Sequence, residues 1–192
     1  TTVTETPTWS YDLSNLLSKV DNSSWTLTDN TFIEAKEVDS DSSGNLYILS
    51  AVFEPEDDRF VLIERTFLGN TLTTLSSTGQ HLRTIEVADA ETGKAYWGSM
   101  DYGRAHLAVS ASGKTLFNPN EKALLIDEQG SITELINEPL IANEWEQVDQ
   151  LRSAAFFDGN FYLQHGGNIL KYSETGVLQQ TIISGWDNVS SN

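Results

Sequence analysis

The segment Asp39-Ser40-Asp41-Ser42-Ser43-Gly44-Asn45 places oxygen-bearing side chains at alternate positions around a glycine. Hard cations such as Ca²⁺ prefer oxygen ligands, so Asp39, Asp41, Ser43 and Asn45 form a candidate calcium site. An EF-hand would require a bidentate Glu at the twelfth position of the loop, where Ser50 stands, so that type of site is excluded. Two alternatives stay open: a looser calcium-binding hairpin, or a hairpin whose Asp and Ser side chains bond their own backbone. No other cofactor is expected.

A second set of candidate residues is aromatic. Four tryptophans, Trp25, Trp97, Trp145 and Trp186, recur along the chain at intervals that match the repeats described below. Exposed Trp and Tyr stack on sugars and peptides, so these segments predict an aromatic platform with a polar rim. The alternative is that a tryptophan recurring once per repeat packs between repeats. The candidate ligand-binding residues are Tyr96, Trp97, Asp101, Tyr102, Arg104, Trp145 and His165.

Other patterns that resemble chemical sites have simpler explanations. The acidic run at residues 54–58 fits a solvated loop tip, with a cation or a basic partner as the alternative. Residues 108–115 match a relaxed phosphate-loop pattern, but they align with a predicted hairpin and no helix can follow them. The histidines His81, His106 and His165 are isolated, no cysteine is present, and no nucleophile elbow occurs. The sequence therefore predicts no catalytic residue.

The elements that must position these residues form a repeat. Residues 105–136 align with residues 151–182 at a shift of 46, and apolar alternation agrees between the two stretches. The aligned pairs include Ala108 with Ala154, Gly113 with Gly159, and Gly130 with Gly176. Each copy predicts four short strands joined by consecutive hairpins. The turns at Ser112-Gly113 and Asp158-Gly159 require a residue at positive φ.

A third copy precedes these two and is longer. Its turn glycines, Gly44 and Gly79, stand 35 residues apart, whereas the corresponding glycines of the later copies stand 17 apart. The additional residues, around 54–63, are predicted to add or extend a hairpin. Residues 12–20 predict a short helix or turn, with Ser10 or Asp12 as the N-cap.

A four-stranded antiparallel unit repeated about every 46 residues resembles the blade of a β-propeller. The stretches Asp158-Gly159-Asn160-Phe161-Tyr162 and Ser173-Glu174-Thr175-Gly176-Val177-Leu178 are similar to divergent propellers of bacterial surface and periplasmic proteins. The resemblance covers residues 31–183 and implies an all-β array of meander units. It also implies a ligand face on the connections at 87–104 and 137–150 and on the loop at 164–168.

We predict a single propeller-like domain over residues 1–192. It comprises a flank at 1–30, repeats at 31–86, 105–136 and 151–183, and a tail at 184–192. Three units do not close a ring. Either the termini supply a fourth unit, or the chain is a piece of a larger ring, or the array is open.

Composition limits the partners. The net charge of −17 repels the phosphates of nucleic acids and anionic lipid headgroups. No stretch of twenty apolar residues is present, the opening residues do not form a signal peptide, and the absence of cysteine excludes disulfides. Richness in Ser, Thr, Asn and Gly favours an extracellular or periplasmic location. We therefore expect neither nucleic-acid binding nor membrane insertion.

These observations predict a non-catalytic binding or interaction module of a secreted or cell-surface protein, with a protein, peptide or carbohydrate ligand. One alternative is a divalent-cation-dependent propeller hydrolase or lactonase. That activity requires Asp, Glu or Asn side chains converging on the axis, and the repeats show no such residue at a shared strand position. Another alternative is a structural spacer in a larger surface protein. An oligomer is expected if the ring is incomplete.

Overall fold

The computed structural model describes residues 9–19, 27–55, 65–87, 106–118, 122–137, 151–165 and 168–183. Within these ranges the chain forms a 3-10 helix, η1, over Leu13–Lys19, followed by three antiparallel sheets of four strands each. Sheet 1 contains β1 (Phe32–Ser40), β2 (Leu46–Pro55), β3 (Arg65–Leu75) and β4 (His81–Val87). Sheet 2 contains β5 (His106–Val109), β6 (Thr115–Asn118), β7 (Lys122–Ile126) and β8 (Ile132–Asn137). Sheet 3 contains β9 (Leu151–Phe157), β10 (Asn160–His165), β11 (Asn168–Ser173) and β12 (Leu178–Ile183).

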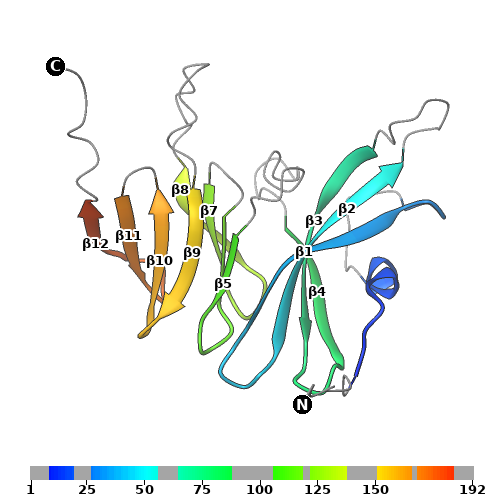
Figure 1. Ribbon diagram of the computed structural model, residues 1–192, viewed down its shortest axis with the longest axis horizontal. Coiled ribbons are helices and arrows are strands. Elements are labelled where there is room, and N and C mark those ends of the chain that lie inside the picture. The colour runs from blue at the N-terminus through cyan, green and yellow to red at the C-terminus, as the bar shows by residue number, and fades with distance from the viewer. Residues whose placement is uncertain are drawn as a thin grey trace, which may run out of the picture.

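In each sheet the strands follow one another in chain order, so each sheet is a meander. The first strand of each sheet, β1, β5 or β9, lies beside the first strand of the next, and the last strands spread apart (Figure 1). This arrangement confirms the predicted all-β, propeller-like array of four-stranded units. The additional residues of the first repeat lengthen β2 and β3 within a four-stranded sheet, so of the two predicted outcomes the described residues show the extended hairpin.

Sheet 2 is buried on both faces, and strand alternation explains how. Leu107 and Val109 on β5 join the core shared with sheet 1, whereas Ala108 between them joins the core shared with sheet 3. A strand that is buried on both sides must be apolar at nearly every position, and residues 123–126 satisfy this requirement. Each of these four residues is at most 7 % exposed. Sheet 2 is therefore the middle layer of the array.

Aromatic side chains fill both cores. Between sheets 1 and 2, the Phe53 ring lies 5.5 Å from the Phe32 ring and 5.7 Å from the Phe67 ring. Between sheets 2 and 3, Phe156 and Phe161 meet edge to face with ring centroids 4.9 Å apart. Pairs at these separations stabilise a core by about 0.5–1.5 kcal/mol beyond the burial of their area.

Tight glycine turns join the strands at one end of the array (Figure 1). Five of the six turns share one pattern, in which an Asp or Ser stands three residues before a glycine. In the first, the Gly44 amide donates to the Asp41 carbonyl at 3.1 Å, and the Asp41 carboxylate accepts from the amides of Ser43 and Asn45. Asp127 caps its turn in the same way, and Ser76, Ser110 and Ser173 use a hydroxyl instead. All six glycines have φ between 72° and 93°, as predicted for Gly113 and Gly159.

The sixth turn differs and corrects one alignment. Asp158 and Gly159 alone join β9 to β10, and Asp158 also has a positive φ of 48°. In sheet 2 the corresponding turn is one residue longer, because Val109 pairs with Thr115 whereas Phe156 pairs with Phe161. Ala154 is therefore structurally equivalent to Leu107. The predicted match of Ala108 with Ala154 is wrong by one position, although the glycine matches hold.

Residues 9–19 cover the face of sheet 1 that points away from sheet 2 (Figure 1). The helix η1 contacts both β1 and β4, so it lies across the sheet, and Leu16 on it is fully buried. Asp12 is the N-cap: its Oδ1 accepts from the Ser14 amide at 3.0 Å and from the Ser14 hydroxyl at 2.7 Å. These bonds from Ser14 lower the pKa of the Asp12 carboxyl. The predicted short helix is confirmed here and does not supply a strand.

Candidate functional site

The two ends of the strands differ in the connections they carry. The six tight turns occupy one end, so the chain leaves β4, β8 and β10 and enters β5, β9 and β11 at the opposite end (Figure 1). We call the first the hairpin end and the second the connection end. The predicted ligand residues Tyr96, Trp97, Asp101, Tyr102, Arg104 and Trp145 fall in segments outside the described residues. His165 is the last residue of β10 and stands at the connection end.

Hydrogen bonds between sheets fasten the hairpin end. The Ser42 hydroxyl donates to the Ala111 carbonyl of the next sheet at 2.8 Å, and the Val109 amide donates to the Asp39 carboxylate at 2.8 Å. Between sheets 2 and 3, the Ser112 hydroxyl donates to the Glu174 carboxylate at 2.6 Å. The bond from Ser112 lowers the pKa of the Glu174 carboxyl. The hairpin end is therefore a bonded scaffold rather than a set of independent loops.

The candidate calcium residues lie within this scaffold. Besides the two backbone amides, the Asp41 carboxylate accepts from Asn45 Nδ2 at 2.8 Å and from Tyr47 Oη at 3.3 Å. Asp39 directs one carboxylate oxygen to the Val109 amide and the other to the Ser40 amide. Ser43 and Asn45 donate their backbone amides to Asp41 and do not point oxygen atoms at a common ion position. The geometry fits a hairpin in which side chains bond their own backbone, and calcium binding stays a prediction.

Burial and charge shift two ionisable groups in this region. Partial burial on its own raises the pKa of Asp41, but hydrogen bonds from Asn45, Ser43 and Tyr47 outweigh it, so the pKa is lowered. Burial, followed by the charge of the Asp41 carboxylate, raises the pKa of Tyr47 to about 12. Tyr47 is therefore a neutral donor to a charged carboxylate at ordinary pH.

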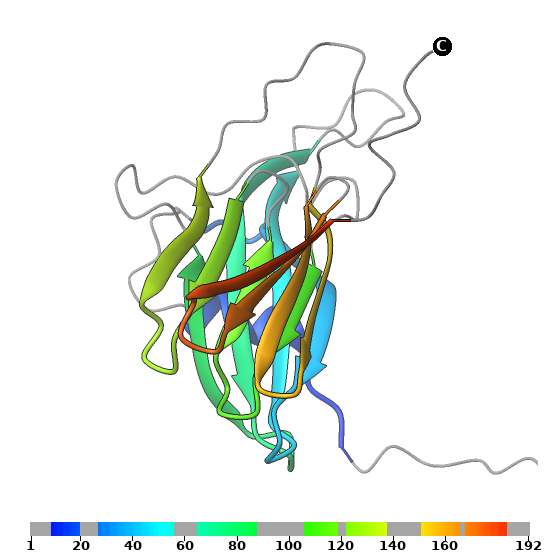
Figure 2. The same cartoon turned by 90° about the vertical axis from the view of Figure 1, so that its left-hand side faces the viewer.

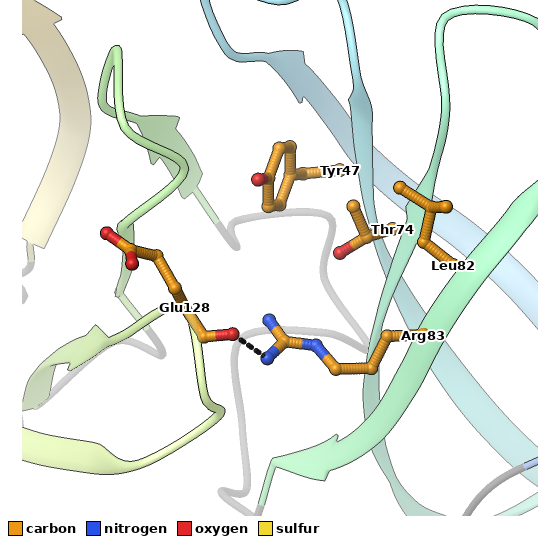
Figure 3. A pocket seen from close by; sticks show the side chains of 5 residues that line it. All are labelled: Tyr47, Thr74, Leu82, Arg83 and Glu128. Atoms are coloured by element: carbon orange, nitrogen blue, oxygen red, sulfur yellow. Dashed lines mark hydrogen bonds between the residues drawn. The ribbon is translucent and has the colours of Figure 1, made fainter.

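A cavity of about 220 Å³ opens between sheets 1 and 2 at the hairpin end (Figure 3). Arg83 enters it from β4 and donates to the main-chain carbonyl of Glu128, in the turn between β7 and β8. The Thr74 hydroxyl is buried there without a hydrogen-bond partner. Tyr47 and Leu82 complete the lining. The cavity offers a guanidinium group and a hydroxyl to a small polar molecule, but the Asp41 carboxylate beside Tyr47 adds negative charge.

Glu54, His81 and His106 make local contacts. Glu54 of the acidic run lies on β2, where it accepts from the hydroxyls of Thr28 and Thr31. The bond from Thr28 lowers its pKa. His81 contacts the Thr84 hydroxyl at 2.8 Å, and His106 Nδ1 lies 4.0 Å from a Glu37 carboxylate oxygen. Among the described residues, no three His, Asp or Glu side chains gather closely enough to hold a metal ion.

Among the described residues, none covers the outer face of sheet 3. In Figure 2, which looks onto this face, no described element lies in front of it. Phe157 is 71 % exposed, and Ile169 and Ile182 are each 40 % exposed. The opposite face of the same sheet packs on sheet 2 through Phe161 and Leu163, both fully buried. Sheet 3 therefore has one core face and one free face.

Sequence reasoning missed two features of this arrangement. The Trp9 indole packs directly over Gly79, so closely that a Cβ there would overlap the ring. Trp9 lies before the first repeat, so the spacing of the other tryptophans gave no reason to select it. The bonding of Asp39 to the next sheet was also missed. The fivefold recurrence of Asp or Ser three residues before glycine identifies the turns as structural, but Asp39 stands outside that pattern, so the sequence carried no signal for this bond.

No helix among the described residues has the length and apolar character needed to cross a membrane. No known protein family matches the sequence, and no curated protein matches it. Among solved structures, the chain is similar to the WD40 domain of Pan2 from Neurospora crassa, with 14 % identity and a TM-score of 0.38. That similarity covers 77 % of this chain and 49 % of the WD40 domain, so the chain spans about half of it.

A protein of unknown function from Bacteroides caccae is similar at 12 % identity and a TM-score of 0.40. This similarity covers 87 % of the chain and 65 % of the Bacteroides protein. Because both TM-scores are below 0.5, the strand pairing and the packing of the sheets, and not these likenesses, define the fold. The chain is an all-β, propeller-like array of three four-stranded sheets.

Proposed function

We propose that the chain is a non-catalytic binding module of a secreted or cell-surface protein, of the divergent bacterial propeller type, with its ligand face at the connection end. The observation that carries the proposal is the separation of the two ends. Short turns bonded to one another occupy the hairpin end, whereas the segments between sheets depart from the other. Binding residues typically lie on loops that a rigid scaffold positions.

The composition of those segments supports one class of ligand. Residues 88–105 and 138–150 contain the aromatic side chains of Tyr96, Trp97, Tyr102 and Trp145 together with both signs of charge. Aromatic faces stack on sugar rings and on peptide side chains, and polar neighbours fix the orientation of the ligand. A chain of net charge −17 repels anions, so a neutral oligosaccharide or a neutral or basic peptide fits best.

The test is a tryptophan-fluorescence titration with a panel of neutral oligosaccharides and of neutral and basic peptides. We expect one ligand class to change the emission. Trp97→Ala and Trp145→Ala should then each weaken binding at least about tenfold, which corresponds to about 1.4 kcal/mol. Phe157→Ala is the matched control, because Phe157 is an exposed aromatic residue at the hairpin end. Unchanged emission with every ligand, or unchanged affinity in both tryptophan variants, would contradict the proposal.

A further inference from the structure

The free face of sheet 3 repeats the positions through which sheet 2 packs on its neighbour. Strand register makes Tyr162 equivalent to Leu116, Ile169 to Ala123 and Ile182 to Ile136. In sheet 2 these three positions are at most 8 % exposed and belong to the core shared with sheet 3. Ile169 and Ile182 keep apolar side chains at the same positions, yet each is 40 % exposed. The face is built for packing and has no partner within the described part of the chain.

The charge on this face differs from that of the whole chain. The chain contains 28 Asp and Glu against 11 Lys and Arg. Alternation places no acidic residue among the outward positions of β9–β12, which carry Ser, Ala, Phe, Asn, Tyr, Gln, Ile and one Lys. That lysine, Lys171, lies 5.9 Å from the centre of the Tyr162 ring. Two copies of a strongly acidic chain repel each other least where neither presents a carboxylate.

The opposite end of the array cannot receive this face. Residues 9–19 cover the outer face of sheet 1, where Leu16 is fully buried and Trp9 packs on Gly79. Head-to-tail stacking of sheet 3 on sheet 1 of the next copy is therefore blocked. The arrangement that remains is the isologous one, in which the same face of both copies meets about a two-fold axis and growth stops at two.

We propose that the outer face of sheet 3 is the interface of a symmetric dimer, in which the sheet 3 faces of two copies pack against each other. Sheets packed in this way align their strands within about 30° and lie about 10 Å apart. The dimer uses a surface distinct from the proposed ligand face, so either proposal can fail alone.

The test is sedimentation equilibrium of the whole chain over a wide range of concentration. We expect the mass to rise from 21.3 kDa towards twice that value, without larger species. Ile169→Asp and Ile182→Asp should each raise the dimer dissociation constant at least about tenfold, because each places a carboxylate in the interface. Val38→Asp is the matched control: Val38 is 59 % exposed on sheet 1, and its replacement should leave the dissociation constant unchanged.

The dependence of dimerisation on salt and a second variant, Lys171→Glu, test the same interface independently. Added sodium chloride screens the repulsion between two acidic copies, so dimerisation should strengthen between 50 and 500 mM, roughly the range over which the Debye length falls well below 10 Å. Lys171→Glu, at a partly exposed position, should weaken the dimer without loss of the folded circular-dichroism spectrum. A monomer at every concentration, an open polymer, or equal dimerisation of wild type, Ile169→Asp and Lys171→Glu would each overturn the proposal.

Discussion

The two terminal faces of the array belong to sheets of the same design but meet different surroundings. The outer face of sheet 1 carries small hydroxyl side chains, and Ser50, Thr71 and Thr73 on it are fully buried beside the segment that contains η1. Thr73 and Thr84 bond to each other there at 3.0 Å. The outer face of sheet 3 carries larger aliphatic, aromatic and amide side chains and is open. The face that the same chain covers therefore buries hydroxyl side chains, whereas the open face leaves Phe157, Ile169 and Ile182 exposed.

The largest expected difference in the free energy of unfolding is between the variants Leu16→Ala and Ile169→Ala. Leu16 lies on the segment that covers sheet 1 and is fully buried, so its truncation leaves a cavity and should lower the free energy of unfolding by about 2–5 kcal/mol. Ile169 is exposed on the open face, so its truncation should cost less than about 0.5 kcal/mol in the monomer. Urea denaturation of dilute protein measures both. Equal losses would mean that the two faces are not covered differently.

A second contrast compares hairpins that differ in their contact with a neighbouring sheet. Gly113 and Gly159 both have positive φ, so replacement by Ala should cost about 1–2 kcal/mol at either position. At Gly113 the new Cβ would also overlap Tyr47 Oη of sheet 1, whereas nothing lies within 4 Å of it at Gly159. Gly113→Ala should therefore destabilise more. Tyr47→Phe removes the overlapping hydroxyl, so the double variant should recover part of the difference; if it recovers none, the sheets are not packed as described.

Acid should lower the free energy of unfolding by a smaller amount, because it protonates carboxylates that accept hydrogen bonds at the hairpin end. The pKa of Asp41 and that of Glu174 are lowered in the folded chain, so each carboxylate stabilises the fold above its unfolded pKa. That contribution is lost as pH falls through the lower folded pKa, which places the change below about pH 4. For partly exposed groups the loss should stay under about 1 kcal/mol each. Denaturation curves of Asp41→Asn and Glu174→Gln between pH 5 and pH 2 should show a shallower pH dependence than wild type.

The smallest expected effect concerns calcium. The Asp41 carboxylate already accepts bonds from Ser43, Asn45 and Tyr47, and Asp39 is bonded to the next sheet. A bound ion would have to replace these bonds, so we expect millimolar calcium to leave the melting temperature of wild type and of Asp41→Asn unchanged. A saturable rise in wild type that Asp41→Asn abolishes would establish the looser calcium-binding hairpin and contradict the bonding described here.

Local patterns predicted much of the fold. Paired glycines and apolar alternation located the hairpins of sheets 2 and 3. The register of β9 was predicted wrongly because turn length, which sets register, differs by one residue between Ser112-Gly113 and Asp158-Gly159. A shift of one residue exchanges the two faces of a strand, and identity between Ala108 and Ala154 could not reveal it.

Contacts between residues far apart in the sequence could not be predicted from the sequence. The cavity lined by Tyr47, Thr74 and Arg83 forms because the turn between β7 and β8 lies against β4. The residues on either side of Arg83 in the sequence do not predict that contact. The open face of sheet 3 escaped notice because its apolar positions resemble those that sheet 2 buries. The aromatic ligand residues stay predictions, because their segments lie outside the described residues.

The contrast between the covered face and the open face can be measured directly with single cysteines, because the chain contains none. Ser50 points outward from sheet 1 and is fully buried, and Ser153 points outward from sheet 3 and is exposed. In dilute native protein, a thiol reagent should modify Ser153→Cys at nearly the rate of an unfolded thiol and should modify Ser50→Cys only as fast as the protein opens. Equal rates at the two positions, or faster reaction at Ser50→Cys, would contradict the account.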